Sequence, residues 1–263
     1  MRELEREKDL NDRDLPVLAL IGAGRVGSAL ARACSTAGIN SRLAGRKDAS
    51  AVAAGAEMVL LCVPDRAIEE ACATIAGAGP RFVGHTSGVS GSEPLAAAAA
   101  TGAATFGFHP LQTVADGTTQ LAGSACAVSG STPEALDLAE SLARRLGMRP
   151  FEIRDEQRAA YHAAAAIASN FLVALEESAA QLLERSDVPD ARDLLAPLVL
   201  RSAANWAERG PDALTGPIAR GDEATVSRHL DAIADRAPEL LELYEALAAR
   251  TRELASERDG ALA

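Results

Sequence analysis

A glycine-rich turn near the start of the chain has the composition of a phosphate-binding site. It reads Gly22-Ala23-Gly24-Arg25-Val26-Gly27, after an apolar run (17–21) that predicts a buried parallel strand and before a predicted helix (25–37). In such a unit the glycines allow a tight turn, close approach of a pyrophosphate and packing of helix on strand. The helix N-terminus favours the negative charge. The turn therefore predicts a dinucleotide site, and the alternative is a purely structural turn.

The end of the second predicted strand, 41–44, indicates which dinucleotide would bind. NAD-binding domains place a carboxylate near this point, where it holds the ribose 2′-hydroxyl. This chain instead has Gly45-Arg46-Lys47. Positive charge suits a 2′-phosphate, so Arg46 and Lys47 favour NADP(H), with NAD(H) less favoured. The alternative is that Arg46 is a solvated surface residue.

The ends of later strands carry further candidates, because ligands of open α/β sheets bind at the carboxyl ends of the strands. Val63 and Pro64 close the strand predicted at 58–63 and are expected to line the cofactor cleft. Ser87, in the segment GHTSG that follows the strand at 81–84, is expected to contact the cofactor as well.

Two of these strand ends also carry histidines. His85 lies in GHTSG, and His109 lies in GFHPLQT together with Gln112. A histidine at the sheet edge could donate a proton or, like the Gln112 amide, bind a substrate oxygen. The alternative for each histidine is that it hydrogen-bonds the backbone of its own loop.

The long helical pattern at 156–185 contains Tyr161-His162 and, eight residues further on, Ser169-Asn170. Helical spacing by four would place His162 and Asn170 on one face of a helix rich in small residues. Buried polar groups need partners, which could be a nicotinamide and a substrate or other side chains. A later segment, LTGPIARGD, places Arg220 where it could grip a carboxylate, or where it only helps to turn the chain.

Strands and helices alternate as far as residue 154, with further strands at 103–108, 124–129 and 149–153 and helices at 66–76, 92–100 and 133–146. This alternation predicts an α/β fold, a doubly wound parallel Rossmann domain over 15–154. The rest is predicted to be an all-α C-terminal domain, 155–256, with later helices at 190–209, 222–235 and 238–255. The charged residues 1–14 and the final residues 257–263 are expected to be disordered tails.

Composition excludes several classes of function. The formal net charge is −11, which disfavours binding to nucleic acid or to an anionic membrane. The four cysteines form no CxxC pair and suggest free thiols in a reducing compartment, so we expect a cytoplasmic protein without a metal site. No signal peptide or membrane-spanning run is recognisable.

The segments GAGRVG, LLCVPD, GHTSGVSG, FHPLQT, YHAAAAIASN and LTGPIARGD, in this order, resemble a family of NAD(P)-dependent oxidoreductases. That family joins a Rossmann domain to a helical C-terminal domain of unassigned function. It is similar to pyrroline-5-carboxylate reductase and to 6-phosphogluconate-dehydrogenase-like reductases, whose second domain forms dimers and part of the substrate site. Some members resemble alternative ketopantoate reductases. The resemblance implies a homodimer formed through the helical domain and a small carboxylate substrate.

One departure from the related dehydrogenases concerns the proton donor. Several of them use a helix lysine as acid and base, whereas this chain has no lysine after Lys47. For reduction of a 2-oxo acid such as ketopantoate, His162 is our first candidate for the proton donor and His109 the second. Ser169 and Asn170 would then orient the carbonyl or the nicotinamide, and Arg220 would hold the carboxylate.

Two other functions are compatible with these residues. A cyclic imine is protonated more easily than a ketone and needs a weaker acid, which suits a site without lysine. Alternatively, the protein could be a non-catalytic NADP-binding sensor or assembly partner, because a fold does not fix a function. A sensor would need the glycine turn and Arg46 but not the polar set formed by His162, Asn170 and Arg220.

Overall fold

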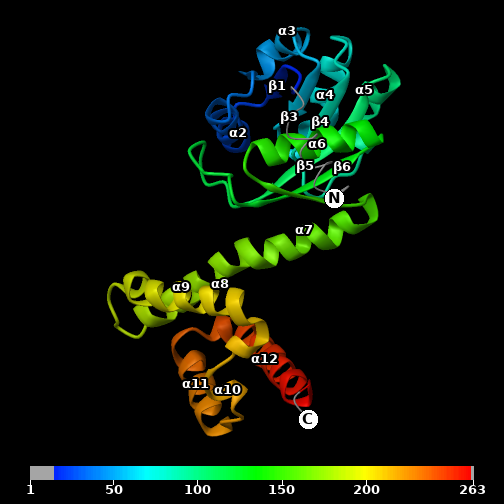
Figure 1. The fold of residues 1–263 in the computed structure, drawn as a ribbon. Coiled ribbons are helices and arrows are strands. Elements are labelled where there is room, and N and C mark those ends of the chain that lie inside the picture. The colour runs from blue at the N-terminus through cyan, green and yellow to red at the C-terminus, as the bar shows by residue number, and fades with distance from the viewer. Residues whose placement is uncertain (1–14, 262–263) are drawn as a thin grey trace. The chain divides into compact units, whose positions relative to one another are not determined.

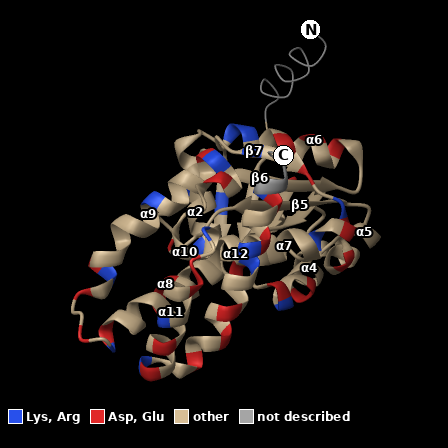
Figure 2. Ribbon diagram, turned by 90° about the horizontal axis from the view of Figure 1, so that it is seen from below, with Lys and Arg blue, Asp and Glu red and all other residues tan. Residues whose placement is uncertain are grey.

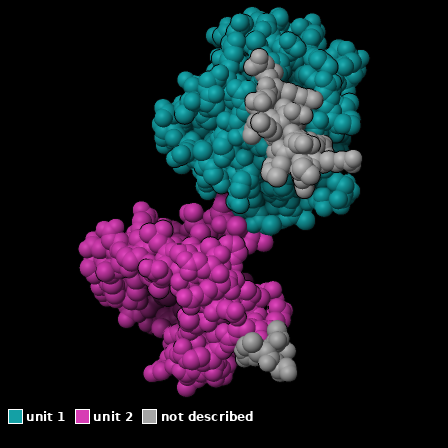
Figure 3. Space-filling model, in the orientation of Figure 1, with its two compact units in different colours: residues 1–166 teal, residues 167–263 magenta. Residues whose placement is uncertain are grey.

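The computed structural model describes residues 15–261. The chain divides into two compact units, residues 1–166 and residues 167–263 (Figure 3). This division falls twelve residues later than the predicted boundary after residue 154, because the first part of the long helix is bonded to the sheet of unit 1. The predicted tail 1–14 lies outside the described residues.

Unit 1 is built on one seven-stranded sheet with the order β2-β1-β3-β4-β5-β6-β7 (Figure 1). The strands are β1 (Leu18–Ile21), β2 (Ser41–Ala44), β3 (Met58–Leu61), β4 (Phe82–His85), β5 (Ala104–Leu111), β6 (Ala125–Gly130) and β7 (Arg149–Glu152). The helices are α2 (Arg25–Thr36), α3 (Ala49–Ala53), α4 (Ile68–Ala76), α5 (Ala96–Ala100), α6 (Pro133–Arg145) and α7 (Arg158–Ala166). Strand and helix alternate as the sequence predicts, which confirms the α/β class.

One strand departs from the predicted all-parallel arrangement. Strand β6 pairs antiparallel with β5, whereas β1 to β5 pair in parallel and β7 pairs in parallel with β6. The physical reason lies in the connections. A parallel neighbour needs a crossover, usually a helix, and the segment from 112 to 124 contains none. Strands β6 and β7 are joined through α6 and can therefore run in the same direction.

Two apolar layers cover the faces of the sheet. On one face, residues such as Leu20, Leu60 and Phe106 pack with side chains of α2 and α6. On the other, Ile21 and Leu61 pack with side chains of α3, α4 and α5. Because side chains alternate along a strand, the odd-numbered residues of β5, from Thr105 to His109, share one face. His109 therefore shares a side of β5 with Gly107, which lies against Arg158 of α7.

Some helix boundaries show recognisable end signals. Thr132 caps α6 by accepting a hydrogen bond from Ala135 N–H, and Gly38 follows α2 in the left-handed conformation at φ +67°. The helix after β3, α4, has no side-chain N-cap. Asp65 begins a 3₁₀ turn, Asp65–Ala67, and makes no capping side-chain bond, because Pro64 occupies the cap position of that turn.

Unit 2 is entirely helical over its described residues. It contains α8 (Leu172–Glu184), α9 (Ala191–Arg209), α10 (Gly216–Ala219), α11 (Glu223–Arg236) and α12 (Leu241–Ala261). Asp222 caps α11 by accepting a hydrogen bond from Thr225 N–H. Helix α12 runs on to Ala261, so the predicted C-terminal tail is wrong over 257–261. Residues 262 and 263, the last two of that predicted tail, lie outside the described part of the chain.

A π-helical segment, Ile167–Phe171, opens unit 2 between α7 and α8. Hydrogen bonds from i to i+5 add a residue to the turn, so side-chain spacing by four does not continue through it. The prediction that His162 and Asn170 share one helix face assumes that spacing by four continues between them. That assumption is wrong beyond Ala166, where the π-helical segment begins.

Within residues 15–261, no helix is both long and apolar enough to cross a lipid bilayer. Acidic and basic residues occur on helices of both units, and the strands of the sheet contain few of either (Figure 2).

Candidate functional site

The glycine turn has the geometry that a pyrophosphate needs. Gly22 has a φ of +120°, and a Cβ added to it would collide with the carbonyl of Cys62. A Cβ at Gly27 would collide with the carbonyl oxygen of Gly22. Gly24, in contrast, has no heavy atom within 4 Å of the position of an added Cβ. Two glycines are thus required by the protein's own packing, while the third leaves open space in front of the turn.

The helix that follows the turn offers unpaired donors to that open space. Gly24 is the N-cap of α2 and makes no side-chain capping bond, and the first turn of the helix carries no acidic residue. Arg25 and Gly24 are exposed, and Val26 is half-buried. Free N–H groups and the helix dipole therefore face solvent without an internal anion to compete for them. The residues present fit the pyrophosphate of a dinucleotide.

Arg46 and Lys47 lie where the sequence predicts a 2′-phosphate contact, directly after β2, and both are exposed. Arg46 forms an ion pair with Glu70 of α4, with Nη1 3.5 Å from Oε1. Arg46 and Glu70 line a cavity of about 60 Å³ that is also lined by Gly22 and Val63. A carboxylate thus reaches this region from α4, although none is present at positions 45–47 directly after β2.

His85 and Ser87 organise the loop after β4. Ser87 N–H donates to His85 Nδ1 at 3.2 Å, so Nε2 carries the proton and donates to the carbonyl of Gly91 at 2.8 Å. His85 is buried, and burial lowers its pKa. Ser87 Oγ accepts from the backbone N–H groups of Val89 and Ser90. The ring nitrogens of His85 are thus occupied by backbone groups of its own loop, which favours the loop-ordering alternative over substrate binding.

Three rings, the imidazoles of His109 and His162 and the phenol of Tyr161, meet between β5 and α7. His109 of β5 and Tyr161 of α7 share a hydrogen bond of 2.6 Å between Nδ1 and the phenol oxygen. The His109 and His162 ring centroids are 6.3 Å apart. Gly88 completes the group, since a Cβ there would lie 2.9 Å from His109 Nε2 and 2.8 Å from His162 Cδ2. His162 is exposed and Tyr161 is half-buried, so the cluster borders solvent.

Burial keeps the paired members of this cluster uncharged at neutral pH. Burial, reinforced by His162 and Arg158, lowers the pKa of His109 to about 4. Burial likewise raises the pKa of Tyr161 to about 12. The His109–Tyr161 pair is therefore a neutral hydrogen-bonding unit at pH 7, and neither member is a strong acid there.

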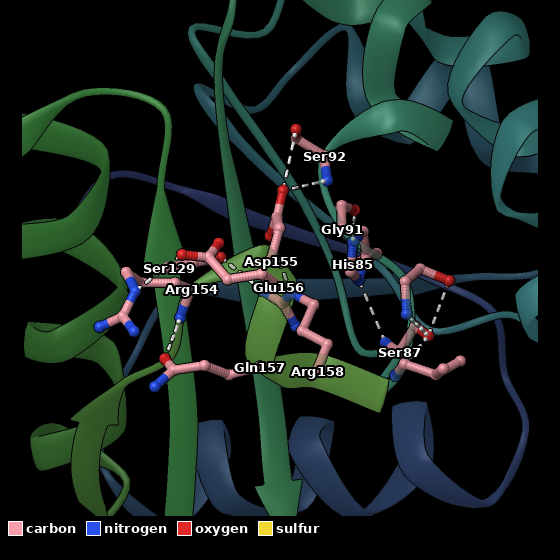
Figure 4. A network of polar contacts seen from close by, with 12 residues as sticks. His85, Ser87, Gly91, Ser92, Ser129, Arg154, Asp155, Glu156, Gln157 and Arg158 are labelled. Atoms are coloured by element: carbon pink, nitrogen blue, oxygen red, sulfur yellow. Dashed lines mark hydrogen bonds and ion pairs between the residues drawn. The ribbon is translucent and has the colours of Figure 1, made fainter. Parts of the chain in front are cut away.

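A buried arginine anchors the start of α7. Arg158 donates to Asp155 Oδ1 at 2.9 Å and to Ser129 Oγ at 2.6 Å, and Asp155 in turn accepts from Ser92 (Figure 4). Hydrogen bonds from Arg158 and Ser92 lower the pKa of Asp155, although its partial burial opposes them. A cavity of about 220 Å³ beside this network is lined by Ser92, Gly107, Ser129 and Asp155 among others.

Other predicted site residues lie apart from this cluster or in unit 2. Gln112 is exposed, and its side chain accepts from Thr113 N–H. Pro64 caps the short turn after β3, and Val63 lies beside Gly22. Ser169 and Asn170 lie in the π-helical segment, and the exposed Arg220 ends α10. The roles assigned to them stay predictions.

Sequence reasoning missed Tyr161, Arg158 and Gly88. The spacing of Arg158, Tyr161 and His162 by three and four residues places them on one helix face, which was a usable signal. Gly88 had no local signal, because its neighbours come from β5 and α7. Among residues 15–261, no three His, Cys, Asp or Glu side chains are grouped so that they could hold a metal ion.

Comparisons with known proteins agree with this architecture. Residues 34–110 match a Rossmann-like domain, and residues 124–251 match a domain of unknown function, DUF2520. A search of curated proteins found no match. The chain thus combines a Rossmann-like domain with the DUF2520 domain, which confirms the resemblance noted from the motifs.

Solved structures share the fold over nearly the whole chain. A candidate NADP oxidoreductase from Bacteroides fragilis is 25% identical, with a TM-score of 0.76 over 91% of this chain and 99% of the other. A Thermotoga maritima protein is 22% identical, with a TM-score of 0.71, and the match covers 92% of this chain and 100% of that protein. A Plasmodium falciparum pyrroline carboxylate reductase with NADP bound is 13% identical, with a TM-score of 0.62, and the match covers 92% of this chain and 99% of that protein.

Proposed function

We propose that this protein is an NADP-dependent oxidoreductase acting on a small carbonyl or imine compound. One observation carries the proposal. A phosphate turn with open space at Gly24 and a pocket lined by Arg46 and Glu70 lie at the same carboxyl edge of the sheet as the His109–Tyr161–His162 cluster. A cofactor site and a set of proton-handling groups at one edge are what hydride transfer requires. The NADP oxidoreductases among proteins of the same fold support this assignment.

A bound NADPH would supply the hydride, and the chain's own residues have the remaining tasks. The α2 N-terminus and the glycine turn hold the pyrophosphate, and Arg46 with Lys47 holds the 2′-phosphate. The neutral His109–Tyr161 pair orients the reacting group through hydrogen bonds rather than through charge. His162, exposed beside His109, is the candidate proton donor.

The substrate class that we propose first is a small 2-oxo acid, with ketopantoate as the first compound to assay. His162 would protonate the developing alkoxide, and Ser169 and Asn170 would orient the carbonyl. Arg220 would hold the carboxylate by paired hydrogen bonds. None of the three solved relatives described above is named as a ketopantoate reductase, so this choice rests on the sequence resemblance.

Reduction of a cyclic imine is the second candidate, and a specific observation favours it. His109 and Tyr161 are both neutral at pH 7 and are weak acids there. A cyclic imine is protonated more easily than a ketone, so its reduction needs hydrogen-bonding groups and only a weak acid. The fold of the pyrroline carboxylate reductase gives further support.

We further propose a cytoplasmic homodimer formed through unit 2. The four cysteines are buried free thiols, as expected in a reducing compartment. A mostly apolar groove of about 410 Å³ lies between α8 and α9 and includes Val173 and Leu200. A second copy of the chain would cover this surface.

The first test is fluorescence titration of the purified protein with NADPH and with NADH. We expect tighter binding of NADPH, followed by its oxidation when ketopantoate, other 2-oxo acids or cyclic imines are added. Binding without turnover of any of these compounds would favour a sensor or assembly role. No binding of either nucleotide would overturn the proposal, because the glycine turn would then be only structural.

A further inference from the structure

Arg158 is the largest of the fully buried side chains, with 1% of its surface exposed. Its Nε and Nη2 are bonded to Asp155 and Ser129, while Nη1 is buried without a hydrogen-bond partner among the described residues. A buried cation with an unsatisfied donor destabilises a fold relative to an apolar side chain of similar size. Its presence therefore calls for an explanation beyond packing.

The position of Arg158 links three parts of the candidate site. Its guanidinium lies against Gly107, where an added Cβ would be 2.5 Å from Nη2, and His109 is two residues further along the same face of β5. Through Asp155 it is joined to Ser92, in the loop ordered by His85. On α7 itself, Tyr161 is one turn further along the same helix face.

We propose that Arg158 is a positioning residue, which fixes α7 against β5 and β6 so that Tyr161 meets His109 at hydrogen-bond distance. This inference rests on the proposed function, in which His109 and Tyr161 contact the substrate. Arg158 itself is buried beneath them and acts only through them. Ser129 and Asp155 set the direction of its guanidinium, because each bonds to a different nitrogen.

The charge of Arg158 has a second effect on the same pair. The groups that face His109 are His162 and Tyr161 on α7, His85 on β4, Asp65 after β3, and Arg158. Burial lowers the His109 pKa most, His162, Arg158 and His85 lower it further, and Asp65 opposes them. A histidine with a lowered pKa stays neutral until the pH falls through that lowered pKa. Removing the positive charge of Arg158 should therefore let His109 protonate at a higher pH.

The test is an NMR titration of the four histidine side chains in the full-length protein, with the His109 signal assigned from His109→Gln. In the wild type we expect His109 to stay neutral down to about pH 4. In Arg158→Met its midpoint should move toward the ordinary value of about 6.5. Arg158→Lys retains the charge, so its midpoint should stay low.

Arg144 provides a matched control on the opposite face of the sheet. It lies on α6, pairs with Glu140 at 3.0 Å and also has a buried Nη1 without a partner among the described residues. Arg144→Met should leave the His109 midpoint unchanged. If Arg158→Met gives the same midpoint as Arg144→Met, the electrostatic part of the inference is wrong.

Activity measures the positioning part. Arg158→Lys cannot bond to Ser129 and Asp155 in the same fork geometry, so kcat should fall by about 10- to 100-fold with NADPH affinity unchanged. If Arg158→Met does not fold, Ser129→Ala and Asp155→Asn remove one anchor each and should reduce kcat in the same direction. Unchanged kcat in all of these variants would overturn the inference. The titration needs no substrate, so it distinguishes failure of this inference from failure of the proposed function.

Discussion

The two units of the molecule differ in where their apolar side chains lie. Unit 1 buries large side chains such as Leu20, Ile21 and Phe108 on both faces of its sheet. Unit 2 buries chiefly small side chains. Its exposed large apolar residues are Ile167, Phe171, Leu172, Val173, Leu175, Leu194, Leu198, Leu200, Trp206, Leu243 and Leu247.

This difference shows that the units depend on other surfaces to different degrees. A sheet covered on both faces by helices has its own core and needs no partner. Apolar side chains exposed along α8 and α9 indicate a surface that associates with another one, because monomeric proteins rarely expose large contiguous apolar patches. This difference agrees with our proposal that unit 1 binds the cofactor and handles the proton and that unit 2 forms the dimer.

The largest expected effect tests whether unit 1 provides the proton. His162→Ala should reduce turnover by about 10³-fold, because general acid catalysis contributes about 10²- to 10⁴-fold. NADPH affinity should change by less than about twofold, since His162 lies outside the phosphate turn. Steady-state kinetics and a fluorescence titration measure the two quantities. Equal loss of both would instead indicate a structural role for His162.

The next effect tests the assignment of association to unit 2. Val173→Glu with Leu200→Glu places charge on side chains that are 67% and 71% exposed in the apolar groove. The dimer dissociation constant should rise by about 100-fold or more, which corresponds to about 2.8 kcal/mol. Light scattering after gel filtration gives the mass at several concentrations. Leu43→Glu in unit 1 is the control, and a dimer that resists the double substitution would contradict the assignment.

A pair of glycine substitutions separates cofactor binding from folding within unit 1. The Cβ added by Gly24→Ala has no heavy atom within 4 Å, so the melting temperature of this variant should equal that of the wild type. Because the pyrophosphate approaches the turn at this point, NADPH should bind about 30-fold more weakly. Gly27→Ala collides with the Gly22 carbonyl and should lower the melting temperature. Calorimetry and titration measure the two effects. Wild-type NADPH affinity in Gly24→Ala would show that nothing approaches the turn there.

The smallest effects concern cofactor choice. Arg46→Ala should weaken NADPH binding by about tenfold, or about 1.4 kcal/mol, and leave NADH binding nearly unchanged. Glu70→Gln frees Arg46 from its exposed ion pair and should strengthen NADPH binding by only about two- to fivefold. Parallel titrations with both nucleotides measure the ratio of NADPH affinity to NADH affinity in each variant. Equal weakening of both by Arg46→Ala would remove the 2′-phosphate argument.

Local patterns predicted most of unit 1. The glycine turn and the apolar strand runs each depend on neighbouring residues, and each is found where it was expected. The antiparallel β6 could also have been inferred, because the segment before it has no helical pattern. In contrast, His85 and His109 looked alike in sequence. Only the fold shows that one bonds to its own loop and the other to Tyr161.

The features that escaped prediction depend on contacts distant in sequence or on hydrogen-bond register. The boundary near 154 was placed where strand patterns stop, whereas Arg158 ties the next helical turns to β6. The π-helical segment has no composition signal in its alanine-rich surroundings, so spacing by four was extended through Ile167 without reason to stop. Gly88 is constrained by His109 and His162, both far along the chain.

The exposed side chain of Trp206 on α9 has a practical consequence. It is the chain's single tryptophan, and 67% of its surface is accessible. Its emission therefore reports on one location, in unit 2, without interference from a second indole. If the helical surface becomes covered at higher protein concentration, the emission maximum should shift to shorter wavelength before any nucleotide is added. The molecule thus contains an intrinsic optical probe of its own assembly state.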